Sequence, residues 1–177
     1  MAKIDPIEGK WIILRCAEEK DAEFTLNIRN DEVLTKYIPK VDSTLENQRL
    51  WIKKTLDKEN ECFFVYENKK GELKGTISYY DVDYENNVCE LGRYISYGNA
   101  IENVEAAILL LDYLFNNLHM EKIILTPDER NKNIISFWKK FGAEFDESIN
   151  MGNWSIAQYV LTIYNYNQRY KKIKSLI

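Results

Sequence analysis

A strand-like stretch, VCELGRY at residues 88–94, carries a carboxylate that is well placed for acid–base chemistry. Alternate side chains of a strand share one face, so Glu90 lies with Val88, Gly92 and Tyr94. A carboxylate among apolar neighbours can accept a proton from a reacting group, which makes Glu90 the candidate general base. A solvent-facing or salt-bridged strand residue is the alternative, and the sequence leaves both open.

The next stretch, GNAIENV at residues 98–104, leads into a long amphipathic helix that we expect from Val104 to Leu118. Helix starts bind phosphates because their N–H groups point outward at the positive end of the helix dipole. Gly98 is the one glycine of this loop, where a phosphate cradle usually has more. Two interpretations remain: phosphate binding through the backbone of residues 98–104, or a plain helix start capped by Asn99 or Asn103.

Arg29 and Asn30 precede the second predicted helix and could line a pocket for an acceptor substrate. The planar guanidinium of Arg29 suits a phosphate or carboxylate, and a surface salt bridge is its ordinary alternative. Tyr79 is a further candidate for substrate binding. Tyr37 and Trp51 could stack on a base or a sugar, although core packing is the commoner role.

The elements that must position these groups follow from the periodicity of apolar residues. Short runs rich in β-branched and aromatic residues predict strands over 11–17, 62–67, 73–84, 86–96, 121–126 and 155–166. Helical spacing predicts helices over 18–30, 42–58, 104–118 and 131–143. Ser43 and Glu46 form a capping-box pattern, and Gly142 is expected to end the last of these helices. The basic segment over 168–177 predicts a solvated tail or a partner-docking helix.

This order of elements predicts a single α/β domain over residues 1–177. The three central strands should form an antiparallel meander, and the later strand–helix alternation should bring the strands over 86–96 and 121–126 together in parallel. We therefore expect a mixed, mostly antiparallel sheet with a central parallel pair and helices on both faces. Ligands bind at the carboxyl ends of parallel neighbours, which places the expected crevice at the end of the Glu90 strand.

Composition argues against several other classes of protein. The net charge is −4 with mixed signs, so a general nucleic-acid surface is not expected. The three cysteines, Cys16, Cys62 and Cys89, lie far apart in the sequence without a CxxC pattern. This spacing predicts buried, reduced thiols and argues against a disulfide framework or a metal site. No stretch has the pattern of a signal peptide or a membrane span, so we expect a cytoplasmic protein, monomeric or homodimeric.

Three stretches, taken in order, resemble the GNAT superfamily of acetyl-CoA-dependent N-acetyltransferases: GTISYYDVDYENNVCELGRYIS, AAILLLDYLFNNLHMEKI and DERNKNIISFWKKFGAEFDE. The resemblance covers almost the whole chain and implies a GNAT-like fold. Within the superfamily the chain is similar to two branches. One acetylates protein N-termini and polyamines, and the other acetylates nucleotide-linked amino sugars, to which the stretch IRNDEVLTKYI is similar.

The resemblance implies acetyl-CoA as the acyl-donor substrate, with its pyrophosphate at the helix start after Gly98. Ile101 and Asn103 occupy the usual glycine positions, and Glu102 adds a carboxylate that would repel a pyrophosphate. The residues implied to contact the cofactor are Tyr94, Ile95, Gly98, Asn99, Ala100, Ile101, Glu102, Asn103, Val104, Asn131, Lys132 and Trp138.

Trp138 stands where many members of the superfamily place a tyrosine that is proposed as the general acid. An indole N–H is no useful acid, so we expect Trp138 to be a wall or core aromatic. A tyrosine elsewhere could replace it, and the sequence does not choose among Tyr79, Tyr80, Tyr94, Tyr159 and Tyr164.

The resulting hypothesis is acetyl transfer from acetyl-CoA to the primary amine of a small molecule, with an amino-sugar nucleotide as the first choice. A polyamine or a protein N-terminus is the alternative acceptor. The alternative from another class is a non-catalytic GNAT-fold binding module, which the missing glycines, Glu102 and Trp138 favour.

Overall fold

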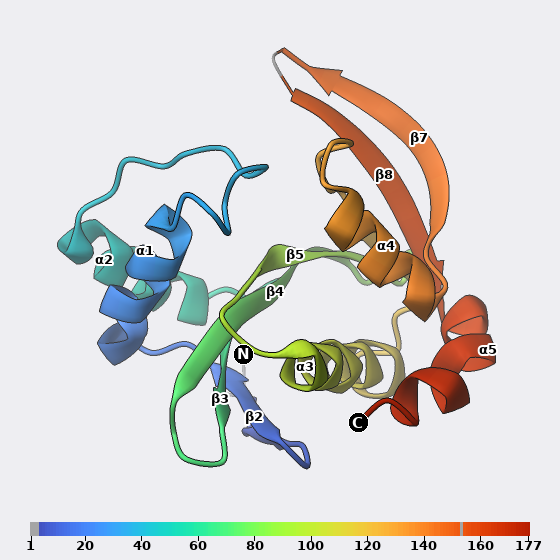
Figure 1. Cartoon of the computed structure of the whole chain (residues 1–177), viewed down its shortest axis with the longest axis horizontal. Coiled ribbons are helices and arrows are strands. Elements are labelled where there is room, and N and C mark those ends of the chain that lie inside the picture. The colour runs from blue at the N-terminus through green and yellow to red at the C-terminus, as the bar shows by residue number, and fades with distance from the viewer. Residues whose placement is uncertain (1–3, 153) are drawn as a thin grey trace.

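The computed structural model describes residues 4–152 and 154–177 and shows one mixed sheet with helices on both faces (Figure 1). The strands are β1 (Ile7–Glu8), β2 (Ile12–Cys16), β3 (Cys62–Asn68), β4 (Leu73–Asp83), β5 (Val88–Ser96), β6 (Lys122–Leu125), β7 (Glu144–Met151) and β8 (Trp154–Thr162). The helices are α1 (Ala22–Asn30), α2 (Leu45–Leu56), α3 (Ala100–Asp112), α4 (Lys132–Phe141) and α5 (Ile163–Lys174). The predicted fold class is confirmed.

The spatial order of the strands is β1-β2-β3-β4-β5-β6-β8-β7, and β5 and β6 form its parallel pair. Their registered pairing runs from Val88 opposite Lys122 to Glu90 opposite Ile124, although β5 continues to Ser96. A bulge follows in β5, where the register against β4 shifts and Arg93 has a φ of 51°. Bulges bend the strand that carries them, so β5 parts from β6 just beyond Glu90.

Helices cover both faces of the sheet because successive side chains of its strands point to opposite sides. On β3, Phe63 and Val65 pack in a cluster with residues of α1 and α2. Phe64 and Tyr66 lie in the larger cluster that contains the buried face of α3. Figure 1 shows α1 and α2 at one side of the molecule and α4 with the β7–β8 hairpin at the other.

A buried carboxylate on α3 joins the first hairpin to the rest of the fold. Glu105 is 2% exposed and accepts hydrogen bonds from the backbone N–H groups of Lys10, Trp11 and Ile12 at 2.7, 2.7 and 2.8 Å. A Cβ at Gly9 would lie 2.6 Å from the carboxyl carbon of Glu105, so a residue without a side chain is required there. This contact ties the turn between β1 and β2 to α3.

Several predicted boundaries were wrong, and each error has a local cause. The cap of α2 is Thr44, whose hydroxyl accepts from the N–H of Asn47, and not Ser43. Along α2, Ile52 and Thr55 are buried, whereas Leu50 and Leu56 are exposed.

The C-terminal third also differs from the prediction. The last predicted strand ends at Thr162, whose hydroxyl caps α5 by accepting from the N–H of Asn165. The segment over 168–177 is not a free tail, because Ile173 is 3% exposed in the main core and the Tyr170 hydroxyl donates to Asp112 at 3.1 Å. Strand β7 was not predicted, since most of its side chains are polar and exposed.

Candidate active site

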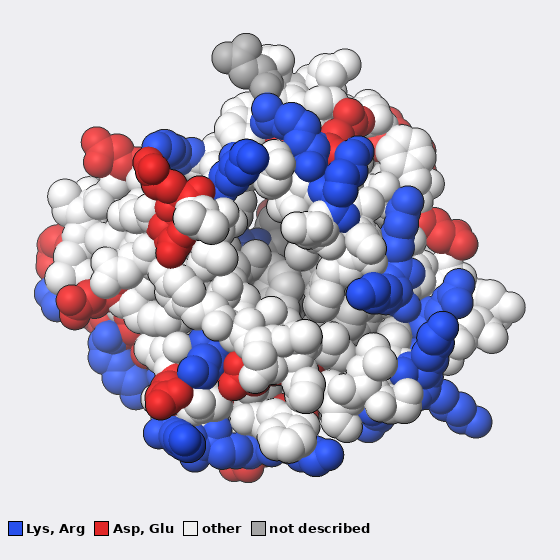
Figure 2. Space-filling model, viewed as in Figure 1, with Lys and Arg blue, Asp and Glu red and all other residues white. Residues whose placement is uncertain are grey.

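A cavity of about 690 Å³ opens where β5 and β6 part. Residues of α1, α2 and the intervening segment line one wall, and the junction of β6 with α4 lines the other. Figure 2 shows this hollow in the middle of one face, with Lys and Arg side chains gathered over α4 and α5 at the right. The lining includes Arg29, Tyr37, Trp51, Tyr80, Arg93, Tyr94, Ile95, Thr126, Asp128, Asn131 and Trp138.

Glu90 lies at the point where the two parallel strands part, and two hydroxyl groups of the cavity wall bind it. The hydroxyl of Tyr80 donates to Glu90 Oε1 at 2.9 Å, and that of Thr126 donates to the same oxygen at 2.5 Å. The carboxylate is thus bound from β4 and β6, the neighbours of its own strand on either side. Each hydroxyl oxygen can accept a hydrogen bond from a ligand while it donates to Glu90.

Gly92 and Arg93 determine how Tyr80 reaches Glu90. A Cβ at Gly92 would lie 2.4 Å from the Tyr80 hydroxyl, so the missing side chain leaves room for that hydroxyl. The Arg93 guanidinium lies 4.4 Å from the centre of the Tyr80 ring and 5.2 Å from that of Trp51. Burial raises the pKa of Tyr80, and the neighbouring Glu90 charge raises it further, so Tyr80 holds its proton at neutral pH.

Tyr79 does not line the cavity, which corrects its expected place in an acceptor pocket. Its side chain is fully buried in the core, where its ring lies near Phe64 and Tyr113. Tyr80 points to the opposite face of β4 and takes the place expected for Tyr79. The sequence contained a signal for this assignment, because Tyr80 pairs with Glu90 in the β4–β5 hairpin and directly opposed residues share a face.

Arg29 reaches the cavity from α1, whereas Asn30 is exposed at the end of that helix and outside the lining. The guanidinium of Arg29 donates to the carbonyl oxygen of Pro39 at 2.6 Å. Among the residues that the structure describes, no carboxylate forms an ion pair with it, so the alternative role of Arg29 in a surface salt bridge is not found there. Burial lowers the pKa of Arg29, which shows that water only partly solvates its charge.

The start of α4 forms the opposite wall. Asn131 caps this helix by accepting from the N–H of Ile134 at 3.3 Å, and it also lines the cavity. Lys132 is exposed beside it. Arg130 is not a free surface charge, because it donates to both carboxylate oxygens of Asp128 at 2.8 and 2.7 Å. These hydrogen bonds lower the pKa of Asp128, so its carboxylate stays ionised.

Aromatic rings close the cavity between β5 and α4. Trp138 is 4% exposed, and its ring centre lies 5.8 Å from that of Tyr94. The Tyr94 hydroxyl donates to the backbone carbonyl of Asn103 at 3.1 Å, and burial raises its pKa well above the ordinary value. Trp138 therefore lies in the cavity wall, as expected for an aromatic without an acidic role. Ile95 completes this wall from the end of β5.

The predicted phosphate loop is shorter than expected, because α3 begins at Ala100 and not at Val104. Asn99 caps the helix, and its side-chain oxygen accepts from the N–H groups of Ile101 and Glu102 at 2.9 and 3.0 Å. Glu102 completes a capping box by accepting from the N–H of Asn99 at 2.8 Å. The helix start therefore has the geometry of the capped alternative, in which side chains of the chain itself occupy its N–H donors.

Asn103, at one of the usual glycine positions, anchors this turn to the sheet. Its side-chain oxygen accepts from the hydroxyls of Ser96 and Tyr66 at 2.5 and 2.8 Å, and its side-chain nitrogen donates to the carbonyl of Gly98 at 3.2 Å. A Cβ at Gly98 would lie 2.7 Å from the Asn103 side-chain oxygen. The remaining glycine thus leaves room for an asparagine that holds the turn in place.

The mixed sheet, whose parallel pair parts over a cavity, fits an acyltransferase of the GNAT fold. The chain belongs to the acetyltransferase (GNAT) domain family, whose family model matches residues 12–144. It is therefore an acetyl-CoA-dependent acetyltransferase. In the part of the chain that the structure describes, no helix is both long enough and apolar enough to cross a membrane.

The chain is similar to further proteins over most of its length. The chain is 30% identical over 166 residues to YkkB of Bacillus subtilis (strain 168), with 87% of this chain and 94% of YkkB covered. Apo FdhC, a nucleotide-linked sugar GNAT, has a TM-score of 0.83 and 23% identity, with 97% of each chain covered. Spermidine N-acetyltransferase from Vibrio cholerae, in complex with CoA and spermine, has a TM-score of 0.78 and 19% identity, with 90% and 99% covered. At these identities the two structures show a shared fold.

Proposed function

We propose that the protein transfers the acetyl group of acetyl-CoA to the primary amine of a small acceptor that carries a negative charge. An amino-sugar nucleotide is the first choice. The observation that carries this proposal is the guanidinium of Arg29, which lines the cavity without a carboxylate partner among the described residues. A phosphate or carboxylate of the acceptor would supply the missing partner.

The charges of the cavity favour this acceptor over a polyamine. Its described lining contains two arginines, Arg29 and Arg93, and a single acidic residue, Asp128. Arg130 already neutralises Asp128 through two hydrogen bonds. Arg93 is likewise paired with Glu61 at 3.4 Å, so Arg29 carries the unpaired charge of the described lining. That charge would repel a polycation, whereas the aromatic rings of Tyr37 and Trp51 offer surfaces for a base or a sugar.

Glu90 is proposed as the final proton acceptor of the reaction. An ammonium group in the cavity would donate to the hydroxyl oxygen of Tyr80 or Thr126, because both face the cavity and both already donate to Glu90. The ammonium first loses one proton through a hydroxyl to the Glu90 carboxylate, which frees the lone pair of the nitrogen. The neutral amine then attacks the acetyl carbon, the carbon–sulfur bond breaks, and a second proton from the nitrogen passes to the leaving thiolate of coenzyme A. This arrangement lets a residue beneath the cavity wall act on a group within it.

The experiment that tests the acceptor class is a panel of amines assayed with acetyl-CoA by the release of free thiol. Amino-sugar nucleotides should be acetylated, and spermidine and short peptides should not. Activity on spermidine or a peptide together with none on any anionic amine would overturn the proposal.

Replacing Arg29 with glutamine should raise KM for the anionic amine by about tenfold or more, because a charge-assisted hydrogen bond is lost. The variant Arg49→Gln is a matched control, since Arg49 lies on the exposed side of α2 in an ion pair with Glu46. An amine that carries no anionic group should have the same KM with both variants. Equal KM values of Arg29→Gln and the parent protein for the anionic amine would remove Arg29 from the acceptor site.

Glu102 should weaken the binding of acetyl-CoA, because its carboxylate occupies the helix start where a pyrophosphate would lie. We expect Glu102→Gln to lower the Kd for acetyl-CoA by about two- to fivefold at low salt, and the effect should shrink as salt screens the charge. Calorimetry measures this directly, with Glu121→Gln as a control at an exposed site. Weaker binding by the variant would mean that the Glu102 carboxylate supports the cofactor site.

A further inference from the structure

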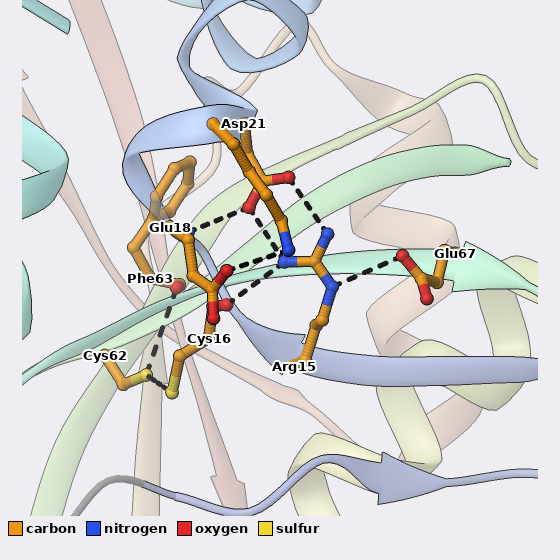
Figure 3. Close-up of polar contacts among 8 residues, drawn as sticks. Arg15, Cys16, Glu18, Asp21, Cys62, Phe63 and Glu67 are labelled. Atoms are coloured by element: carbon orange, nitrogen blue, oxygen red, sulfur yellow. Dashed lines mark hydrogen bonds and ion pairs between the residues drawn. The ribbon is translucent and has the colours of Figure 1, made fainter. Parts of the chain in front are cut away.

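Cys16 and Cys62, 46 positions apart in the sequence, lie side by side at the edge of the core (Figure 3). Cys16 ends β2 and Cys62 begins β3, and the two strands pair in antiparallel fashion. Both side chains are in the cluster on the α3 face of the sheet, and their sulfur atoms are 2.9 Å apart. A disulfide bond requires about 2.05 Å, so the two atoms need to move together by roughly 0.9 Å.

The surrounding contacts fix the position of this pair. The Arg15 guanidinium donates to both carboxylate oxygens of Asp21 at 2.8 and 2.9 Å and to Glu67 at 3.2 Å (Figure 3). Asp21 also accepts from the N–H of Glu18, so the turn that follows Cys16 is held to its own strand. The backbone on both sides of Cys16 is therefore held in place.

A small oxidant has a route to these thiols. A second cavity, of about 210 Å³, lies beneath α2 and is lined by Cys16, Cys62, Lys58 and Glu61 among others. The sulfur–sulfur hydrogen bond, burial and the partner thiol raise the pKa of Cys62, so the pair is protonated at neutral pH. Because the thiolate is the nucleophile, oxidation should be slow at neutral pH and faster as the pH rises.

We propose that Cys16 and Cys62 form an oxidative modification site, which a small hydroperoxide converts reversibly into a disulfide. One thiolate attacks the peroxide oxygen, releases hydroxide or alcohol, and becomes a sulfenic acid. The second thiol then attacks that sulfur and expels water. The balance is two thiols and one peroxide to one disulfide, one water and one further water or alcohol, and a thiol reductant reverses the change.

The disulfide would close a covalent loop around one wall of the active site. The segment between the two cysteines contains α1, α2 and their connection, which carry Arg29, Tyr37 and Trp51. Cross-linking the base of this segment lowers the entropy of its unfolded state. The proposal concerns stability and local opening, and it is independent of the identity of the acceptor.

The test treats the folded wild-type protein with hydrogen peroxide and then counts thiols by alkylation after unfolding. The alkylated thiols should fall from three to one, and peptide mapping should find Cys16 joined to Cys62, with Cys89 still reduced. Cys16→Ser and Cys62→Ser should each abolish the cross-link, whereas Cys89→Ser should retain it. Three alkylated thiols after treatment, or a cross-link that forms only in denaturant, would overturn the proposal.

A second measurement does not depend on the variants. The oxidised protein should melt about 5–10 °C higher than the reduced protein, and a thiol reductant should reverse the shift. Amide hydrogen exchange should slow between residues 17 and 61 and stay unchanged in α4 and α5. Unchanged exchange in that segment of the cross-linked protein would contradict the proposal that the disulfide restricts its local opening.

Discussion

Glu90→Gln is expected to lower the turnover of acceptor by about a hundred- to ten-thousand-fold, the usual range for loss of a general base. Glutamine keeps the shape of the side chain and can still accept hydrogen bonds from Tyr80 and Thr126, so the cavity should stay intact. It cannot, however, take up the proton that those hydroxyls pass on. Affinity for acetyl-CoA should barely change, because the start of α3 lies beyond the end of this strand.

The experiment on Glu90 needs two measurements on the same preparation. The melting temperature shows whether the variant folds, and the rate at saturating acetyl-CoA shows what the carboxylate contributes. Glu147→Gln is the matched control, since Glu147 is exposed on β7. A folded Glu90 variant with undiminished turnover would remove Glu90 from the mechanism, and the search would turn to Tyr80 or to a bound water molecule.

Glu105→Gln is expected to destabilise the fold by about 2–4 kcal/mol, because hydrogen bonds to a buried charge are lost and a backbone donor loses its acceptor. The carboxylate accepts from three backbone N–H groups, two of them at Oε2 and one at Oε1. A glutamine oxygen can replace Oε2, but the amide nitrogen then faces the N–H of Lys10, and two donors oppose each other. The first hairpin loses its attachment to α3.

Thermal or urea unfolding measures this effect, and a loss of this size corresponds to a drop of roughly 5–15 °C in melting temperature for a chain of this length. The exposed control Glu147→Gln should melt with the parent protein. Amide exchange in β1 and β2 should rise more than in β8, since the lost contact is local. A variant that melts within a degree of the parent would show that Glu105 does not anchor the hairpin.

The sequence was most informative where side chains repeat with a clear period. The meander β3–β4–β5, the buried strand β6, and helix α4 with its left-handed Gly142 were predicted because apolar periodicity and turn residues agree there. It was least informative at boundaries. Thr162 and Ile163 favour a strand by composition, yet the hydroxyl of Thr162 caps a helix, and this helix is held by a long-range contact of Tyr166 with Asp112 that no local pattern predicts.

The sequence predicted the strand that carries Glu90, but it did not predict the hydrogen-bond partners of Glu90. Alternation placed Glu90 and Gly92 on one face, and the bulge at Arg93 changes the alternation beyond them. The contact of Thr126 with Glu90 joins residues 36 positions apart, and no local pattern encodes it. The thiol pair was missed for the same reason, since sequence spacing does not reveal which strands are neighbours.

The position of β8 between β6 and β7 has a consequence for how the chain is made. The ribosome synthesises β6 and β7 before β8, so each of these two strands lacks one neighbour until β8 has emerged. Helix α5, whose Tyr166 and Ile173 belong to the main core, emerges after β8. Open edges of this kind favour pairing with other chains, so a nascent chain, or one shortened before β8, should be more prone to aggregation than the folded protein, in which β8 pairs with both strands.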